Sequence, residues 1–200
     1  MAKRKTELVL VAGINGTGKT TWLNEEVLKK SKKSLVVTSH ETEWAELPLV
    51  KTKKEIYDLS GHARILYDGP ETLKKITHFH GGSLILDDAR MFLSKHTEGE
   101  IRNIYISRRQ IAVDIYMSAH GLRQIPIECF SYASWLILFN TSENFSGRKN
   151  ELLPELYQLI IETQQRIKKK VLAGNPYYHE IILLDAQIQS IYESNRKNNR

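Results

Sequence analysis

One stretch of this sequence decides the fold: Gly13-Ile14-Asn15-Gly16-Thr17-Gly18-Lys19-Thr20. It follows an apolar run over residues 7–12 (ELVLVA), which is typical of a buried parallel strand. Helical periodicity begins within it and predicts a helix over residues 18–33. A strand, a glycine-rich turn ending in Gly-Lys-Thr and a helix, in this order, predict a phosphate-binding loop, the P-loop.

Each part of the P-loop has a role in holding a phosphate chain. The glycines let the backbone turn tightly and point its N–H groups at phosphate oxygens. We expect Lys19 to reach the β- and γ-phosphates and the Thr20 hydroxyl to ligate magnesium, so ATP and Mg²⁺ are the predicted cofactors. The residues expected to contact the nucleotide are Gly13, Ile14, Asn15, Gly16, Thr17, Gly18, Lys19, Thr20 and Thr21.

A second motif is an apolar strand over residues 83–87 (SLILD) that ends in Asp87 and is followed by Asp88. This is the Walker B pattern. We expect Asp87 to hold magnesium through water, and Asp88 to polarise the water that attacks the γ-phosphate. The alternative is a buried strand that happens to end in two turn-forming aspartates.

A third segment follows at residues 107–126. A strand over residues 113–118 ends in Ser118, and His120 comes shortly after it. Because strand ends face the ligand crevice in an open α/β sheet, His120 is a candidate sensor of the γ-phosphate. A histidine that caps the next turn is the alternative.

Two arginines, Arg108 and Arg109, end the helix predicted over residues 98–111. They are candidates for stabilising transition-state charge, either in their own site or in that of a neighbouring subunit. Alternatively, they complement the macrodipole at the carboxyl end of their helix. The other candidates, ranked lower, are Arg90, Arg102 and Arg123.

The order of predicted elements favours an α/β fold with an open, mostly parallel sheet and helices on both faces. Further strands are predicted over residues 34–39, 63–67, 135–140 and, less clearly, 178–184. Further helices are predicted over residues 53–59, 70–78 and 153–172. We expect one domain over residues 1–200, with a nucleotide-binding core at 6–142 and a helix, a possible strand and a basic tail at 143–200.

The composition favours a globular protein with an anionic partner. The net charge is +6, and clustered basic charge favours nucleic acid through counterion release. No apolar run reaches the roughly 18–20 residues that a transmembrane helix needs. The single cysteine, Cys129, excludes an intramolecular disulfide and fits a reducing cytosol. The basic clusters lie at residues 3–5, 29–33, 51–54, 168–170 and 196–200.

Three pieces of the sequence, VAGINGTGKTT, SLILDDAR and RRQIAVDIYMSAHGLRQIP followed by WLILFN, resemble the FtsK–HerA superfamily of RecA-like P-loop ATPases. The likeness is strongest to the genome-packaging ATPases of membrane-containing icosahedral viruses, and Zot-like phage assembly ATPases are also similar. The family often has glutamine as its sensor, whereas this chain has Ser118-Ala119-His120, with Gln124 beyond the strand. Zot-like proteins usually carry a membrane span, which this sequence lacks.

This resemblance implies a ring, expected to be a hexamer, that moves double-stranded DNA through a central channel. A neighbour's arginine would complete each site, and loop lysines and arginines would grip the phosphate backbone. A capsid or vertex protein is an implied partner, and host cytoplasm or the virion is the implied location.

Three other functions stay open. A small nucleoside or nucleotide kinase would use Tyr67-Asp68-Gly69 for its acceptor and Arg108-Arg109 in a lid. A non-catalytic nucleotide switch or DNA-binding accessory factor is the second. A conjugation or DNA-segregation ATPase of the same superfamily is the third. The position of Trp44 in a polar loop also leaves packing against adenine or against a neighbouring subunit open.

Overall fold

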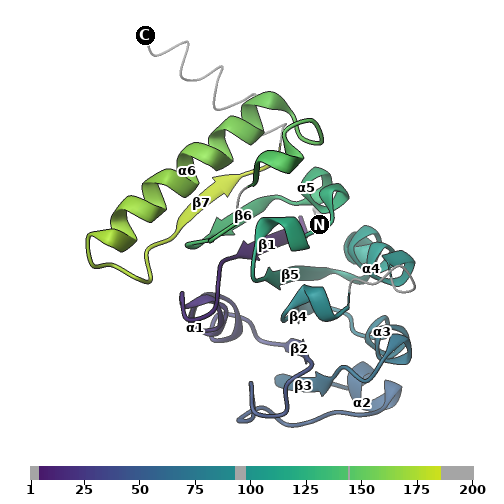
Figure 1. Ribbon diagram of the computed structural model, residues 1–200. Helices are drawn as coiled ribbons and strands as arrows, with labels where there is room; N and C mark the ends of the chain where they lie inside the picture. The colour runs from purple at the N-terminus through teal and green to yellow at the C-terminus, as the bar shows by residue number, and fades with distance from the viewer. Residues whose placement is uncertain (1–4, 93–97, 144, 186–200) are drawn as a thin grey trace.

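A single twisted sheet organises the chain (Figure 1). The computed structural model describes residues 5–92, 98–143 and 145–185, and within them seven strands pair in the order β3-β2-β4-β5-β1-β6-β7. Every pair is parallel except β6 with β7, which confirms the predicted mostly parallel α/β sheet. The strands are β1 (Leu8–Ala12), β2 (Ser34–Thr38), β3 (His62–Leu66), β4 (Gly82–Leu86), β5 (Val113–Ala119), β6 (Trp135–Leu138) and β7 (Glu180–Leu183).

The predicted helices appear in the predicted order, with differences in detail, and the short 3-10 helices η2, η3 and η4 were not predicted. The helix predicted over 18–33 stops at Leu28, and its second half, η1, is a π-helix; a short helix, α5, was not predicted. No glycine or proline marks this early end. Instead, the Ser31 N–H donates hydrogen bonds to the carbonyls of Val27 and Leu28. The helices are α1 (Lys19–Trp22), η1 (Leu23–Leu28), α2 (Lys53–Tyr57), α3 (Pro70–Ile76), η2 (Ala89–Met91), α4 (Glu98–Ile111), η3 (Leu122–Gln124), α5 (Ile127–Tyr132), η4 (Phe145–Arg148) and α6 (Pro154–Leu172).

Local sequence signals explain several of these boundaries. Thr52 caps α2 in a capping box with Glu55, which satisfies free N–H groups of its first turn. Helix α6 begins at Pro154, the first-turn position that proline favours. It ends where Gly174 adopts a φ of +100° and the Asn175 N–H bonds the Lys170 carbonyl, a glycine stop that the sequence predicts.

The two faces of the sheet are covered unequally. Alternation along β1 sends Leu8 and Leu10 into the larger core and Val9 and Val11 into the smaller one. The larger core includes residues of α2 to α6, whereas the smaller core is closed by α1, η1 and the loop around Trp44. The predicted helices on both faces are therefore confirmed, with most of the helical cover on one face.

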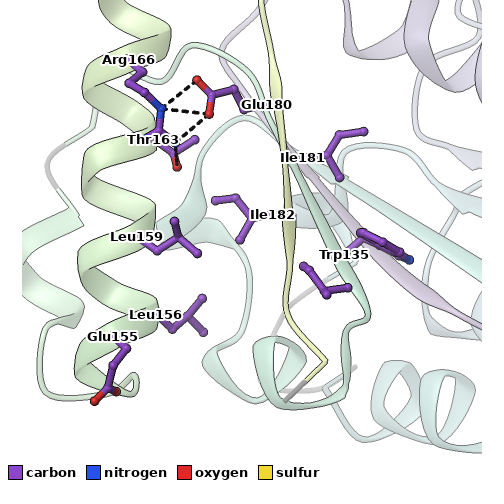
Figure 2. A pocket seen from close by; sticks show the side chains of 10 residues that line it. Trp135, Glu155, Leu156, Leu159, Thr163, Arg166, Glu180, Ile181 and Ile182 are labelled. Carbon is purple, nitrogen blue, oxygen red and sulfur yellow. Dashed lines mark hydrogen bonds and ion pairs between the residues drawn. The ribbon is translucent and has the colours of Figure 1, made fainter. Parts of the chain in front are cut away.

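The last described helix and strand form a distinct layer at one edge of the sheet. Helix α6 packs on β7, and a shallow groove lies between them, lined by apolar side chains such as Leu156, Leu159 and Ile182 (Figure 2). The guanidinium of Arg166 closes one end of the groove through its Nη2, 2.7 Å from Oε2 of Glu180. The extra strand predicted at the C-terminal side is thus present, antiparallel to β6.

The direction of the strands positions the functional site. Because β1, β2, β4, β5 and β6 are parallel, the loops after their carboxyl ends meet at one edge of the sheet. The P-loop, Asp87, Asp88 and His120 all follow such ends. Residues 3, 4 and 196–200 of the basic clusters lie outside the described residues. Within the described ranges no helix is long and apolar enough to cross a membrane.

The start of β4 offers a test of the sheet packing. A Cβ atom at Gly82 would lie 2.5 Å from the Lys33 carbonyl oxygen, and its φ of +145° disfavours any side chain. We expect Gly82→Ala to lower the free energy of unfolding by about 2 kcal/mol or more and the melting temperature by several degrees. The control Gly99→Ala, with open space around its Cβ position, should change stability by less than about 0.5 kcal/mol. Equal melting temperatures for the two variants would contradict this packing.

Candidate nucleotide-binding site

The P-loop is fixed between the ends of two strands. The Gly13 N–H donates to the Ala119 carbonyl at 3.1 Å, and the Ile14 N–H donates to the Asn140 carbonyl at 2.9 Å. Gly16 and Gly18 adopt φ values of +77° and +95°, which favour glycine strongly. The loop therefore has the tight backbone that the sequence predicts, held at the carboxyl edge of β5 and β6.

Lys19 folds back over this loop. Its ammonium donates to the carbonyls of Gly13 at 2.6 Å and Ile14 at 3.1 Å. Burial lowers the pKa of Lys19, and the carboxylates of Asp87 and Asp88 partly offset that effect. The lysine thus places its charge between the loop and the acidic pair, where a phosphate chain would lie.

Asp87 is a buried carboxylate with a partner on each oxygen. Ser118 Oγ on β5 donates to Oδ1 at 2.7 Å, and Trp44 Nε1 donates to Oδ2 at 2.8 Å. Trp44 is buried and belongs to the smaller core, so the suggestion that it packs against adenine or a neighbouring subunit is wrong. Its indole N–H instead orients the acid that we predict to hold magnesium.

Asp88 lies beside it in a strained backbone conformation. Its φ of +54° is unusual for a residue with a side chain, and such outliers cluster at functional sites. Oδ2 lies 3.3 Å from His120 Nε2 and 2.8 Å from Arg90 Nη2. Oδ1 is buried and has no hydrogen-bond partner among the described residues. Asp88 lines the same pocket as Lys19 and Thr20, which is consistent with the water-activating role predicted for this acid.

His120 and Ser118 both take part in the site. The His120 side chain contacts Asp88, and its backbone N–H donates to Gln124 Oε1 at 3.0 Å. Ser118 Oγ accepts from the Asp88 N–H at 2.9 Å while it donates to Asp87. One hydroxyl therefore bridges both acids, and Gln124 supports the loop that carries the histidine.

Three pocket residues escaped the sequence reasoning. His40 and Glu43 come from the loop after β2, and Tyr177 comes from the turn before β7. Burial raises the pKa of Glu43, and the neighbouring Asp87 raises it further. For His40 and Glu43, the only signal in the sequence is that β2 is expected to end at the same edge of the sheet as β4. No local pattern in the sequence marks Tyr177 as a pocket residue. Arg90, ranked low from the sequence, also lines the pocket.

The structure brings most of the predicted residues together. One pocket is lined by Lys19, Thr20, Thr21, Asp87, Asp88 and His120 together with Asn15, Gly16 and Gly18, while Gly13, Ile14 and Thr17 form the loop beneath it. The residues fit a magnesium–nucleotide complex because exposed Thr20 and buried Asp87 supply oxygen ligands beside the lysine. Their roles in hydrolysis stay predictions.

Arg108 and Arg109 lie elsewhere. Helix α4 ends at the amino end of β5, about 20 Å of strand away from the pocket edge. Arg108 is buried, and its guanidinium donates to the carbonyls of Tyr105 at 2.6 Å and Tyr132 at 3.1 Å. Arg109 is exposed. Neither arginine completes the site of its own chain, so a transition-state role stays a prediction about a neighbouring subunit, for which exposed Arg109 is better placed.

Several solved structures have a fold similar to that of this chain. The genome packaging NTPase B204 from Sulfolobus turreted icosahedral virus 2, in complex with AMP, superposes with a TM-score of 0.67 at 14% identity, covering 91% of this chain and 94% of that one. This chain has the fold of that packaging NTPase. The complex of B204 with ATP-gammaS gives a TM-score of 0.62 at 16% identity, covering 94% of this chain and 95% of that one.

The likeness in fold to B204 agrees with the resemblance noted in the sequence. The N-terminal domain of zonular occludens toxin from Neisseria meningitidis is a weaker neighbour, with a TM-score of 0.43 at 14% identity over 70% of this chain and 79% of that one. No family model matches the sequence, and neither does any curated protein. The likeness to B204 is one of fold, across nearly the whole of both chains.

The contrasting environments of the two arginines give a testable prediction. Arg108→Ala removes the donors of two carbonyls, and we expect it to lower the free energy of unfolding by about 1–3 kcal/mol. Arg109→Ala, next to it but exposed, should stay within about 0.5 kcal/mol of the wild type. Thermal denaturation of both variants checks this, and a neutral Arg108→Ala would show that the guanidinium has no structural role.

Proposed function

We propose that this chain is an ATPase that hydrolyses ATP with Mg²⁺ and uses the energy to move double-stranded DNA, as a viral genome-packaging motor. One observation carries the hydrolytic part. The acidic pair Asp87–Asp88 faces Lys19 and Thr20 across a single pocket. Both oxygens of Asp87 accept hydrogen bonds, whereas Oδ1 of Asp88 has no hydrogen-bond partner among the described residues. This difference suits separate roles, with Asp87 binding the metal and Asp88 activating the water.

The proposed mechanism assigns each group a task. The P-loop N–H groups and the Lys19 ammonium bind the β- and γ-phosphates. Thr20 and, through water, Asp87 would hold magnesium, which would supply positive charge to offset that of the phosphates. Asp88 orients a water for attack on the γ-phosphorus and accepts its proton, while the bond from that phosphorus to the ADP oxygen breaks. His120, in contact with Asp88, would link the state of the γ-phosphate to the loop that continues to Gln124.

The DNA-moving part of the proposal rests on charge and on the likeness in fold. A similar fold is found in B204, the DNA-packaging ATPase from Sulfolobus turreted icosahedral virus, and this chain has a net charge of +6. Lys29 and Lys30 pair with Glu25 and Glu26, so they are less available to phosphates. Within the described basic clusters, exposed lysines that remain as candidates to grip the DNA backbone are those at 32, 51, 53, 54 and 168–170.

Assembly follows from the same proposal. Because neither Arg108 nor Arg109 reaches its own pocket, a ring, expected to be a hexamer, would let Arg109 complete a neighbour's site. A capsid or vertex protein is the proposed partner, and host cytoplasm or the virion the proposed location. A conjugation or DNA-segregation ATPase would use the same site chemistry.

The kinase alternative has weaker support. Its acceptor residue would be Asp68, but this carboxylate accepts a hydrogen bond from the Thr72 hydroxyl and lies after β3, an edge strand of the sheet. Its lid would need Arg108 and Arg109, which lie near the amino ends of the strands, whereas the pocket lies at their carboxyl ends. The features that a kinase requires therefore do not meet at the phosphate pocket.

The direct test is ATP hydrolysis by the purified protein with and without double-stranded DNA. We expect DNA to stimulate turnover, and we expect Lys19→Ala and Asp88→Asn to reduce it by about 100-fold or more, because each removes a group acting on the transferring phosphate. Glu71→Gln, which alters an exposed acid far from the pocket, is the control and should behave like the wild type. Phosphate transfer to a nucleoside acceptor, with no DNA effect, would contradict the proposal in favour of a kinase.

The bridging hydroxyl of Ser118 gives a finer test of the acidic pair. Ser118→Ala should raise the Mg²⁺ concentration needed for half-maximal hydrolysis by about tenfold or more, because groups that orient a metal ligand contribute to metal affinity. The matched control is Ser83→Ala, a buried serine on neighbouring β4 whose hydroxyl contacts Ser31 instead. An unchanged Mg²⁺ dependence in Ser118→Ala would exclude a positioning role for this serine.

A further inference from the structure

A second hollow adjoins the phosphate pocket on the face of the sheet that α1 covers. The two hollows share Gly18, Thr21 and Tyr177, so they are continuous past the P-loop. The lining of the second one is largely aromatic and comes from three separate segments: the helix after the P-loop, the end of β6 and the turn before β7. The aromatic residues are Trp22, Phe139, Tyr177 and His179.

The turn before β7 directs two of these rings to the same side. Tyr177 and His179 are separated by one residue in a segment leading into a strand, and both line the hollow. Tyr178, between them, points the other way: its hydroxyl lies 3.4 Å from Glu180 Oε1, and the Lys170 ammonium lies over its ring. Tyr177 and His179 therefore line one side of this segment, and Tyr178 contacts residues on the other.

Packing fixes the orientation of the rings. The His179 ring stacks on the buried Phe139 ring with centroids 4.7 Å apart and 28° between their planes. Tyr177 lies against the P-loop, because a Cβ atom at Gly18 would be only 3.3 Å from its Cδ1. Yet Tyr177 is 63% exposed, so much of a large aromatic ring is left uncovered directly beside the phosphate-binding backbone.

We infer that this hollow holds the nucleobase of the bound nucleotide, a purine stacked on the rings of Tyr177 and His179. The inference rests on the proposed nucleotide-binding function and extends it to the part of the ligand that the P-loop does not touch. A flat ring system suits a slot lined by aromatic faces, and its phosphates would enter the P-loop through the shared boundary at Gly18 and Thr21.

The chemistry of the slot also predicts its selectivity. The charged groups near it, Glu25 and Glu26, are exposed and already paired with Lys29 and Lys30. Stacking alone tolerates any base with a sufficient π-face, because it does not depend on the hydrogen-bonding edge. ATP and GTP should therefore bind with affinities within about tenfold of each other.

The test compares ATP with inorganic tripolyphosphate, which shares the phosphates and lacks the base. Binding is measured by calorimetry on the full chain with Mg²⁺. We expect Tyr177→Ala and His179→Ala each to weaken ATP binding by about 5-fold to 100-fold and to leave tripolyphosphate binding unchanged. Tyr177→Phe, which keeps the ring, should bind both as the wild type does. Tyr57→Ala, which removes a similarly exposed tyrosine from α2, is the matched control.

The outcomes separate this inference from the proposed function. Unchanged ATP affinity in both alanine variants, or equal weakening of ATP and tripolyphosphate, would overturn the base slot while leaving the P-loop site intact. A wild-type protein that binds tripolyphosphate as tightly as ATP would overturn it too. Binding of neither ligand by the wild type would overturn the nucleotide function itself. Because Tyr177 is largely exposed, its alanine variant should fold, and its melting temperature checks this.

Discussion

The carboxylate of Asp87 is held by two hydrogen bonds that come from opposite sides of its strand. Ser118 donates from β5, and Trp44 donates from the loop after β2, so the strands that flank β4 each contribute one donor. This arrangement is possible only because parallel neighbours end at the same edge of the sheet. The distance between the acidic pair and the P-loop is therefore set by strand order, with β5 as the spacer between β4 and β1.

Two of the three non-glycine residues with positive φ in the described part of the chain lie beside this carboxylate; the third, Ala112, precedes β5. Trp44 and Asp88 both adopt positive φ values, 56° and 54°, and both touch or adjoin Asp87. Such conformations cost roughly 1–3 kcal/mol each and persist where the surrounding packing determines them. Here the indole of Trp44 is buried in the smaller core, and the Asp88 N–H bonds Ser118. The smaller, thinly covered face of the sheet thus serves mainly to hold the site in place.

The parts of the site that the sequence predicts are those whose signals are local. The P-loop and the acidic strand end each lie within a few residues, and the alternation of strands and helices determines that they share an edge. His40, Glu43 and Tyr177 reach the pocket only through non-local pairing, of β2 with β4 and of β7 with β6, which no single segment reveals. Arg108 shows the converse: the Arg108-Arg109 pair suggests catalysis, whereas the structure shows the Arg108 guanidinium buried and donating to two backbone carbonyls.

The contact between Gly18 and Tyr177 joins the first helix of the chain to its last described strand. Strand β7 is an edge strand that pairs with β6 alone, so it belongs to the part of the sheet that opens most easily by local unfolding. A ligand that touched both sides of this contact would bind only when the edge strand is docked. By linkage, such a ligand would stabilise the docked state of β7. Slower hydrogen exchange in β7 would therefore report that the site is occupied, although the P-loop follows β1, two strands away.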